Sequence, residues 1–60
     1  MFKIGDKVRI HITDTRSPII DFDKEEGVIT DIKNIRNEVL YQINIDGNTI
    51  FAYEFEIIKM

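Results

Sequence analysis

The chain has 60 residues, of which 43% are hydrophobic and 32% charged, and its formal net charge is −3. This length accommodates a single domain, residues 1–60, which excludes a two-domain enzyme and a deep cavity between lobes. No apolar run approaches the roughly 20 residues of a membrane-spanning helix. A membrane partner is therefore not expected. Cysteine is absent, which rules out a disulfide framework and predicts a protein of the reducing cytoplasm.

The composition favours strands over helices. β-branched and aromatic residues account for 26 of the 60 positions, and thirteen of these are isoleucine. Such side chains lose rotamer freedom in a helix but pack well on a pleated sheet. An all-β fold is therefore expected.

The first predicted strand, residues 7–12, follows a turn at Gly5-Asp6 and alternates strictly between apolar and polar residues. A long irregular segment, residues 13–26, comes next and contains Pro18, which a central strand does not tolerate. Its apolar side chains are too many for a free loop, so we expect it to fold back over one end of the core. These side chains are Ile19, Ile20 and Phe22.

The second predicted strand, residues 27–33, breaks the simple alternation. Ile29 and Ile32 are three positions apart, so a bulge near Asp31 is needed if both are to point inward. A polar turn is expected at residues 34–37, where Ile35 would be exposed.

A tight hairpin is predicted where Asp46-Gly47-Asn48 separates strands at residues 39–46 and 49–53. Either two-residue turn places Ile50 and Ala52 on the face of Ile45. Phe51 and Tyr53 are then left on the opposite face.

A short 3-10 turn at Glu54-Phe55 and a last strand at residues 56–59 complete the chain, with Phe55 and Ile57 expected to point inward. Five short strands predict a small closed barrel, because closure removes edges that would otherwise aggregate. Its core should contain Val8, Ile10, Ile12, Tyr41, Ile43, Ile45, Ile50 and Ala52.

Five short motifs along nearly the whole chain carry a resemblance to a known superfamily. They are Ile4-Gly5-Asp6-Lys7-Val8, Ser17-Pro18, Gly27-Val28-Ile29 with Ile32, Tyr41-Gln42-Ile43, and Tyr53-Glu54-Phe55-Glu56-Ile57. This layout resembles the SH3-like barrels, and among them small bacterial or prophage-encoded proteins related to the KOW and nitrile hydratase β-subunit barrels. The resemblance implies a five-stranded SH3-like barrel and says little about activity. The chain departs from these relatives at Asp23-Lys24-Glu25-Glu26, where they often carry a glycine. It also lacks the tryptophan of the aromatic groove with which signalling SH3 domains bind proline-rich peptides.

The predicted partner-binding surface is aromatic. Outward aromatic side chains on a small barrel are typical anchors for a partner. The residues are Phe51 and Tyr53, with Phe22 from the long loop and with His11 or Arg9 at the rim. In the competing interpretation the long loop covers these aromatic rings as a second core.

A nucleic-acid or ribosome-associated binder, similar to the KOW barrels, is the alternative function. Its phosphate contacts would come from Lys7, Arg9, Arg16, Lys33 and Arg36. The net charge of −3 weighs against it, and an ordinary solvated face is the favoured interpretation of the outward Lys7-Arg9-His11 stripe. A homo-oligomer that buries Ile35, Ile58 or Leu40 is a third possibility.

Catalytic residues, cofactors and metal ligands are not expected. His11 is the only histidine, and Ser17 lies beside a proline without a nucleophile-elbow motif. The acidic segment Asp21–Gly27 invites comparison with a calcium loop, but it lacks the glycine and glutamate that an EF-hand needs at its sixth and twelfth positions. Acid–base catalysis by the Glu54-Glu56 pair would need one carboxylate to be desolvated, and a barrel of this size offers little room for that.

The sequence therefore predicts a non-catalytic interaction module that binds a protein partner. Met1 and the self-contained strand pattern suggest a complete small gene product. By analogy alone, a phage or mobile element of a low-GC bacterium could encode it as an accessory or inhibitor protein.

Overall fold

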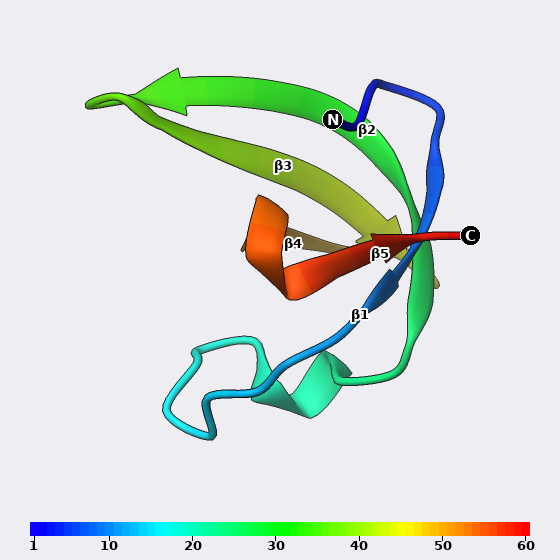
Figure 1. Cartoon of the computed structure of the whole chain (residues 1–60). Helices are drawn as coiled ribbons and strands as arrows, with labels where there is room; N and C mark the ends of the chain where they lie inside the picture. Colours follow the sequence, from blue (N-terminus) through cyan, green and yellow to red (C-terminus); the bar gives the residue numbers. More distant parts are fainter.

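The computed structural model describes residues 1–60 as five antiparallel strands and two 3-10 turns (Figure 1). The elements are β1 (Lys7–Ile10), η1 (Ile20–Phe22), β2 (Glu26–Ile35), β3 (Glu38–Ile45), β4 (Asn48–Tyr53), η2 (Glu54–Glu56) and β5 (Ile57–Lys59). All five strands belong to one sheet of order β4-β3-β2-β1-β5, which confirms the all-β prediction. No helix is long and apolar enough to cross a membrane.

Strand β1 lies between β2 and β5, and alternate side chains along it are buried and exposed. It ends at Ile10, two residues earlier than predicted. The reason is a side-chain contact: the Ile12 amide donates to Asp23 Oδ1 at 2.8 Å instead of to a neighbouring strand. Ile12 is buried nonetheless, so the predicted inward face continues past the end of the strand.

Strand β2 is the longest strand and pairs with β1 on one side and with β3 on the other. Its first residues pair with β1, and residues from Val28 onward pair with β3. The register shifts between Ile29 and Asp31, which confirms the predicted bulge and lets Ile32 pack against the core. The strand extends to Ile35, so the turn predicted at 34–37 is shorter: only Arg36 and Asn37 lie outside the strands, both with positive φ.

Gly27 allows β2 and β3 to approach closely. A Cβ atom at this position would lie 2.5 Å from the carbonyl oxygen of Asn44 and 2.7 Å from the Ile45 side chain. No side chain fits there without moving backbone, so this glycine is required by packing and not by its φ angle.

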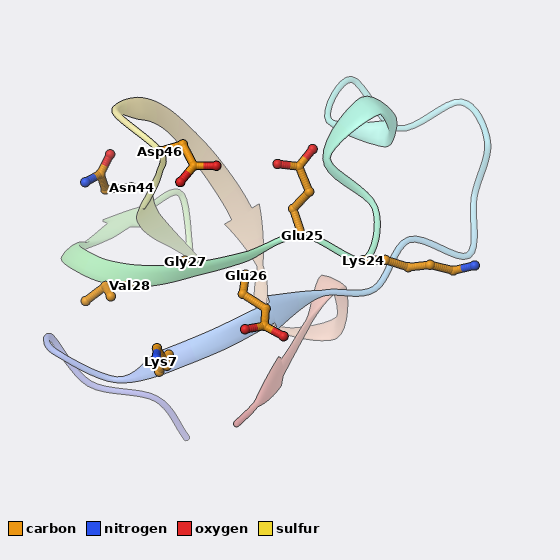
Figure 2. Close-up of a pocket in the computed structure, with 8 residues that line it drawn as sticks. All are labelled: Lys7, Lys24, Glu25, Glu26, Gly27, Val28, Asn44 and Asp46. Atoms are coloured by element: carbon orange, nitrogen blue, oxygen red, sulfur yellow. The ribbon is translucent and has the colours of Figure 1, made fainter.

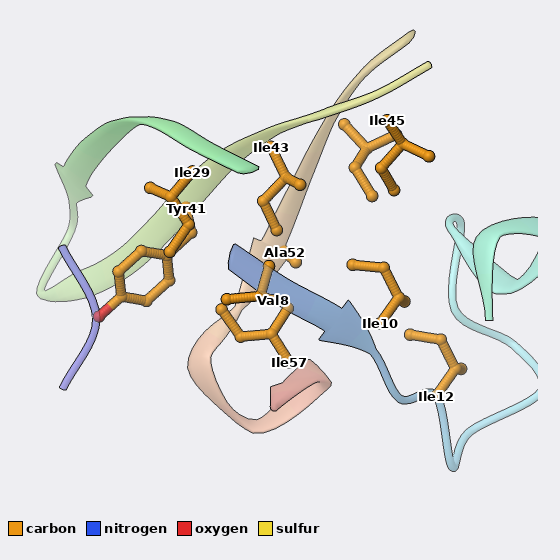
Figure 3. Close-up of a cluster of buried hydrophobic side chains, with 10 residues drawn as sticks. Val8, Ile10, Ile12, Ile29, Tyr41, Ile43, Ile45, Ala52 and Ile57 are labelled. Carbon is orange, nitrogen blue, oxygen red and sulfur yellow. The ribbon is translucent and has the colours of Figure 1, made fainter. Parts of the chain in front are cut away.

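Ten buried side chains form the core on the concave side of the sheet (Figure 3). All eight residues expected inside are among them, and Ile29 and Ile57 complete the set. The core residues are Val8, Ile10, Ile12, Ile29, Tyr41, Ile43, Ile45, Ile50, Ala52 and Ile57. The burial of all eight confirms the predicted sidedness of the strands.

The sheet does not close on itself, so the all-β prediction is confirmed but closure into a barrel is not. Strand β4 pairs only with β3, and β5 pairs only with β1, so no ladder joins the two ends of the sheet. The physical reason is the connection: η2 separates β4 from β5, and all three residues of β5 pair with β1. The outer edge of β4 therefore remains free.

The predicted inward position of Phe55 is wrong. Phe55 is 76% exposed, whereas Glu56 is buried and Ile57 points inward as predicted. A 3-10 turn has three residues per turn, so it interrupts the alternation that a strand would continue. The Glu56 carboxylate is held inside by two donors, the Tyr53 amide at 2.9 Å and the Ser17 hydroxyl at 3.0 Å.

The long segment between β1 and β2 folds back onto the core, as expected. Ile19, Ile20 and Phe22 pack against the buried cluster, and the last two belong to η1. Its polar anchors are the Ser17 and Asp23 side chains, which bond to Glu56 and to the Ile12 amide. Both bonds tie the segment to the same end of the β1–β5 pair, where Ile10 lies opposite Ile57.

Candidate protein-binding surface

The outer face of the β3–β4 hairpin carries a group of apolar side chains. Residues directly opposite each other in an antiparallel pair share a face. Tyr53 lies opposite Leu40, and Phe51 lies opposite Gln42, while their neighbours Tyr41 and Ala52 point into the core. Phe51 is 45% exposed, so the long loop does not cover it.

Phe55 enlarges this group. Its ring stacks on that of Tyr53, with centroids 5.5 Å apart and an angle of 5° between the planes. Phe55 was expected to point inward with Ile57, because the 3-10 turn was predicted to end at Phe55, whereas it continues to Glu56. The exposed carboxylate of Glu54 is the signal that this turn meets solvent. We call Leu40, Phe51, Tyr53 and Phe55 the aromatic surface.

The surroundings of the aromatic surface are negative. The stretch from Glu38 to Glu56, which forms β3, β4 and η2, contains four acidic residues and no lysine, arginine or histidine. The charge of Glu38 is the main cause that raises the pKa of the Tyr53 hydroxyl, followed by its partial burial. Glu38 lies on β3 two residues before Leu40 and on the same face, so a carboxylate adjoins the aromatic surface.

The free edge of β4 borders the aromatic surface. Asp46 and Gly47 form the hairpin turn with φ angles of 49° and 86°, and Ile45 pairs with Asn48 beside it. In such a hairpin alternate residues bond across the ladder, so the backbone groups of Thr49 and Phe51 face away from β3. No further strand meets them.

The other predicted contact residues lie elsewhere. Phe22 packs against the core and makes no ring pair with Phe51 or Tyr53. Arg9 and His11 are exposed on β1 and just beyond it, and two strands separate β1 from β4 in the sheet order. The structure thus groups Phe51 and Tyr53 with Leu40 and Phe55, and not with the proposed rim.

The cations of the nucleic-acid alternative do not form one patch. Three of the five are paired with carboxylates: Arg9 with Glu26 at 2.9 Å, Arg16 with Asp14 at 3.2 Å and Lys33 with Asp31 at 3.7 Å. The bonds from Arg16 lower the pKa of Asp14. The loop containing Arg16 and the β2–β3 turn containing Arg36 lie at opposite ends of the molecule (Figure 1).

One cavity of about 570 Å³ lies at the start of β2, between β1 and the β3–β4 turn (Figure 2). Side chains of both signs line it, and Val28 is the only hydrophobic one. Glu25 and Asp46 point toward the same space above β2, whereas Lys7 and Glu26 lie on its other side. The lining is Lys7, Lys24, Glu25, Glu26, Gly27, Val28, Asn44 and Asp46. This mixture offers no apolar site for a small molecule.

The polar groups inside the molecule have structural partners. The Tyr41 hydroxyl donates to Glu54 Oε1 at 3.1 Å, and burial together with this bond raises its pKa. No buried side-chain polar atom is without a partner, and no three acidic or histidine side chains are placed to hold a metal ion. In the acidic segment Asp21–Gly27, Asp23 binds the Ile12 amide and Glu26 binds Arg9.

Comparison with protein-family models, with curated proteins and with solved structures found no match to this chain.

Proposed function

We propose that the chain is a non-catalytic interaction module that binds another protein through the aromatic surface. The observation that supports this is the Tyr53–Phe55 stack: Phe55 is 76% exposed, and Tyr53 shares the outer face of β4 with Phe51, which is 45% exposed. Contact with a partner would remove this apolar area from water at a gain of about 25 cal/mol per Å². Exposed aromatic groups of this kind typically mark interaction sites.

We further propose that the fold is a member of the SH3-like barrels. The supporting features are the five-strand order, the bent β2 shared between both parts of the sheet, and the 3-10 turn before the last strand. The cytoplasmic location and the origin from a phage or mobile element remain predictions that are based on the composition of the sequence.

A capture experiment with two matched variants tests the proposed function. The whole chain, immobilised, is exposed to a bacterial lysate, in parallel with Phe51→Ser/Phe55→Ser and with Ile58→Ser. Ile58 is the control because it is 50% exposed on β5, away from the aromatic surface. We expect a protein retained by the parent chain and by Ile58→Ser but lost with the double variant.

Two results would contradict the proposal. One is capture that is equal for all three chains, which would place the contact elsewhere. The other is retention of nucleic acid instead of protein, with an affinity that falls steeply with salt, as phosphate contacts require.

A further inference from the structure

We propose that the partner segment is an extended basic peptide that adds as a strand to the free edge of β4, with an arginine or lysine over the Tyr53–Phe55 stack. This inference rests on the proposed function and specifies the chemistry of its ligand.

The edge of β4 is suited to strand addition. It is six residues long, carries no charged side chain and contains no proline. Natural edge strands are usually protected by charges, prolines or short length, as β5 is with three residues and Lys59. An unprotected edge with the outward amides of Thr49 and Phe51 offers backbone hydrogen bonds to an incoming strand.

The charge of the partner follows from the hairpin and η2. These elements contain no cation, and Glu38 lies on the outer face of β3, two residues before Leu40, the residue opposite Tyr53. The charge of Glu38 also raises the pKa of Tyr53. A cationic side chain would meet both the face of an aromatic stack and a carboxylate, and each attracts it. The nearest lysine on this face, Lys33 opposite Leu40, is already paired with Asp31.

The pitch of a strand fits this arrangement. Side chains on one face of a strand repeat every two residues, as Phe51 and Tyr53 do on β4. A strand beside β4 would place alternate side chains along the aromatic surface, and one of them would reach Phe55 and Glu38. A second copy of this chain is the less suitable occupant, because its own β4 region has the same negative charge.

The test is a selection from a displayed library of random twelve-residue peptides on the immobilised whole chain. We expect selected peptides with arginine or lysine among alternating β-branched residues, and an affinity that decreases as salt screens the charges. Each selected peptide is then synthesised in two forms, with one or the other set of alternate amides N-methylated. One form should lose binding and the other should keep it, because only one set can donate to β4.

Three variants identify the site. Phe55→Ala should remove binding, and Glu38→Gln should weaken it about threefold to tenfold. Asp46→Asn is the matched control: it removes one charge at the far end of β4, and asparagine tolerates the positive φ of this turn residue. Its affinity should stay near that of the parent chain.

The outcomes separate this inference from the proposed function. Peptides that need Phe55 but are acidic or neutral, or that bind equally in both methylated forms, would overturn the inference alone. Selection of no peptide that depends on Phe55 would overturn both. Sedimentation that shows a dimer joined through β4 would make a second copy the occupant and overturn the inference.

Discussion

Both faces of the β3–β4 hairpin carry aromatic and aliphatic side chains, but in opposite environments. On the inner face Tyr41, Ile43 and Ala52 are at most 1% exposed, whereas on the outer face Phe51 is 45% exposed. Both faces come from the same alternating strands, so the difference follows from which side meets the rest of the sheet. The inner face accounts for stability, and the apolar groups of the outer face have no comparable role in folding.

This difference can be tested by substitution, from the centre of the core outward. Stability here means the free energy of unfolding, measured by urea denaturation followed with far-ultraviolet circular dichroism. A domain of this size has a total of only about 5–15 kcal/mol, so losses of a few kcal/mol are decisive.

Ile43→Ala should have the largest effect. The side chain is fully buried among Val8, Ile29 and the other core residues. Its truncation should cost about 2–5 kcal/mol through lost transfer energy and the cavity that remains. Asn44→Ala, one residue further on the exposed face, is the control and should change stability by less than about 0.5 kcal/mol. A small loss for Ile43→Ala would show that the interior is not packed as described.

Gly27→Ala should cost about 1–3 kcal/mol, because a Cβ meets the Asn44 carbonyl oxygen and only a backbone shift relieves it. Gly47 provides the contrast. It has open space around its α-carbon but a φ of 86°, so Gly47→Asn should be nearly neutral, whereas Gly27→Asn should be at least as harmful as Gly27→Ala. Equal effects of asparagine at both positions would contradict the close approach of β2 and β3.

Ser17→Ala should destabilise by about 1–2 kcal/mol, because it leaves the buried Glu56 carboxylate without one of its two donors. The loss should appear first as faster amide exchange in the long loop that Ser17 anchors. Thr15→Ala, exposed in the same loop, should have no measurable effect. Unchanged exchange in Ser17→Ala would show that the hydroxyl does not hold the loop.

Tyr41→Phe should cost about 1 kcal/mol near neutral pH through loss of the bond to Glu54. Burial, then the bond to Glu54, raises the pKa of Tyr41 above its ordinary value of 10.0 in the folded chain. A raised folded pKa means that its stabilisation is fully present below about pH 10 and is lost as the pH rises through the folded value. The urea midpoint, measured from below pH 10 to above it, should therefore fall less steeply with pH in Tyr41→Phe than in the parent chain. Equal slopes would mean that Tyr41 titrates normally.

Local patterns predicted the strands, the bulge and the hairpin because each depends on neighbouring residues. The alternation of Val8 and Ile10 fixes one face without reference to the rest of the chain. The end of β1 could not be predicted, because it depends on the carboxylate of Asp23, eleven positions away from Ile12. Sheet closure likewise depends on whether two distant edges meet.

The candidate site was predicted in part for the same reason. Phe51 and Tyr53 follow from strand alternation, and their faces are as expected. Phe55 was missed because the 3-10 turn runs one residue further than predicted, to Glu56, so the inward alternation of the last strand begins only at Ile57. Phe22 was grouped with these rings because it is aromatic, but its side chain packs against the core instead of joining the outer face.

Phe55→Ala should have the smallest effect on stability, about 0.5 kcal/mol or less, because the ring is mostly in water before and after unfolding. Ile57→Ala, two residues further along, is the comparison: Ile57 is 5% exposed and belongs to the core, so its loss should cost about 2–5 kcal/mol. The same Phe55→Ala chain should nevertheless lose its partner. If its unfolding free energy instead falls by more than about 1.5 kcal/mol, beyond what an aromatic pair contributes, the stack belongs to the folding core. Phe55 would then have a structural reason to be aromatic, and the division of the hairpin into a stabilising and a binding face would fail.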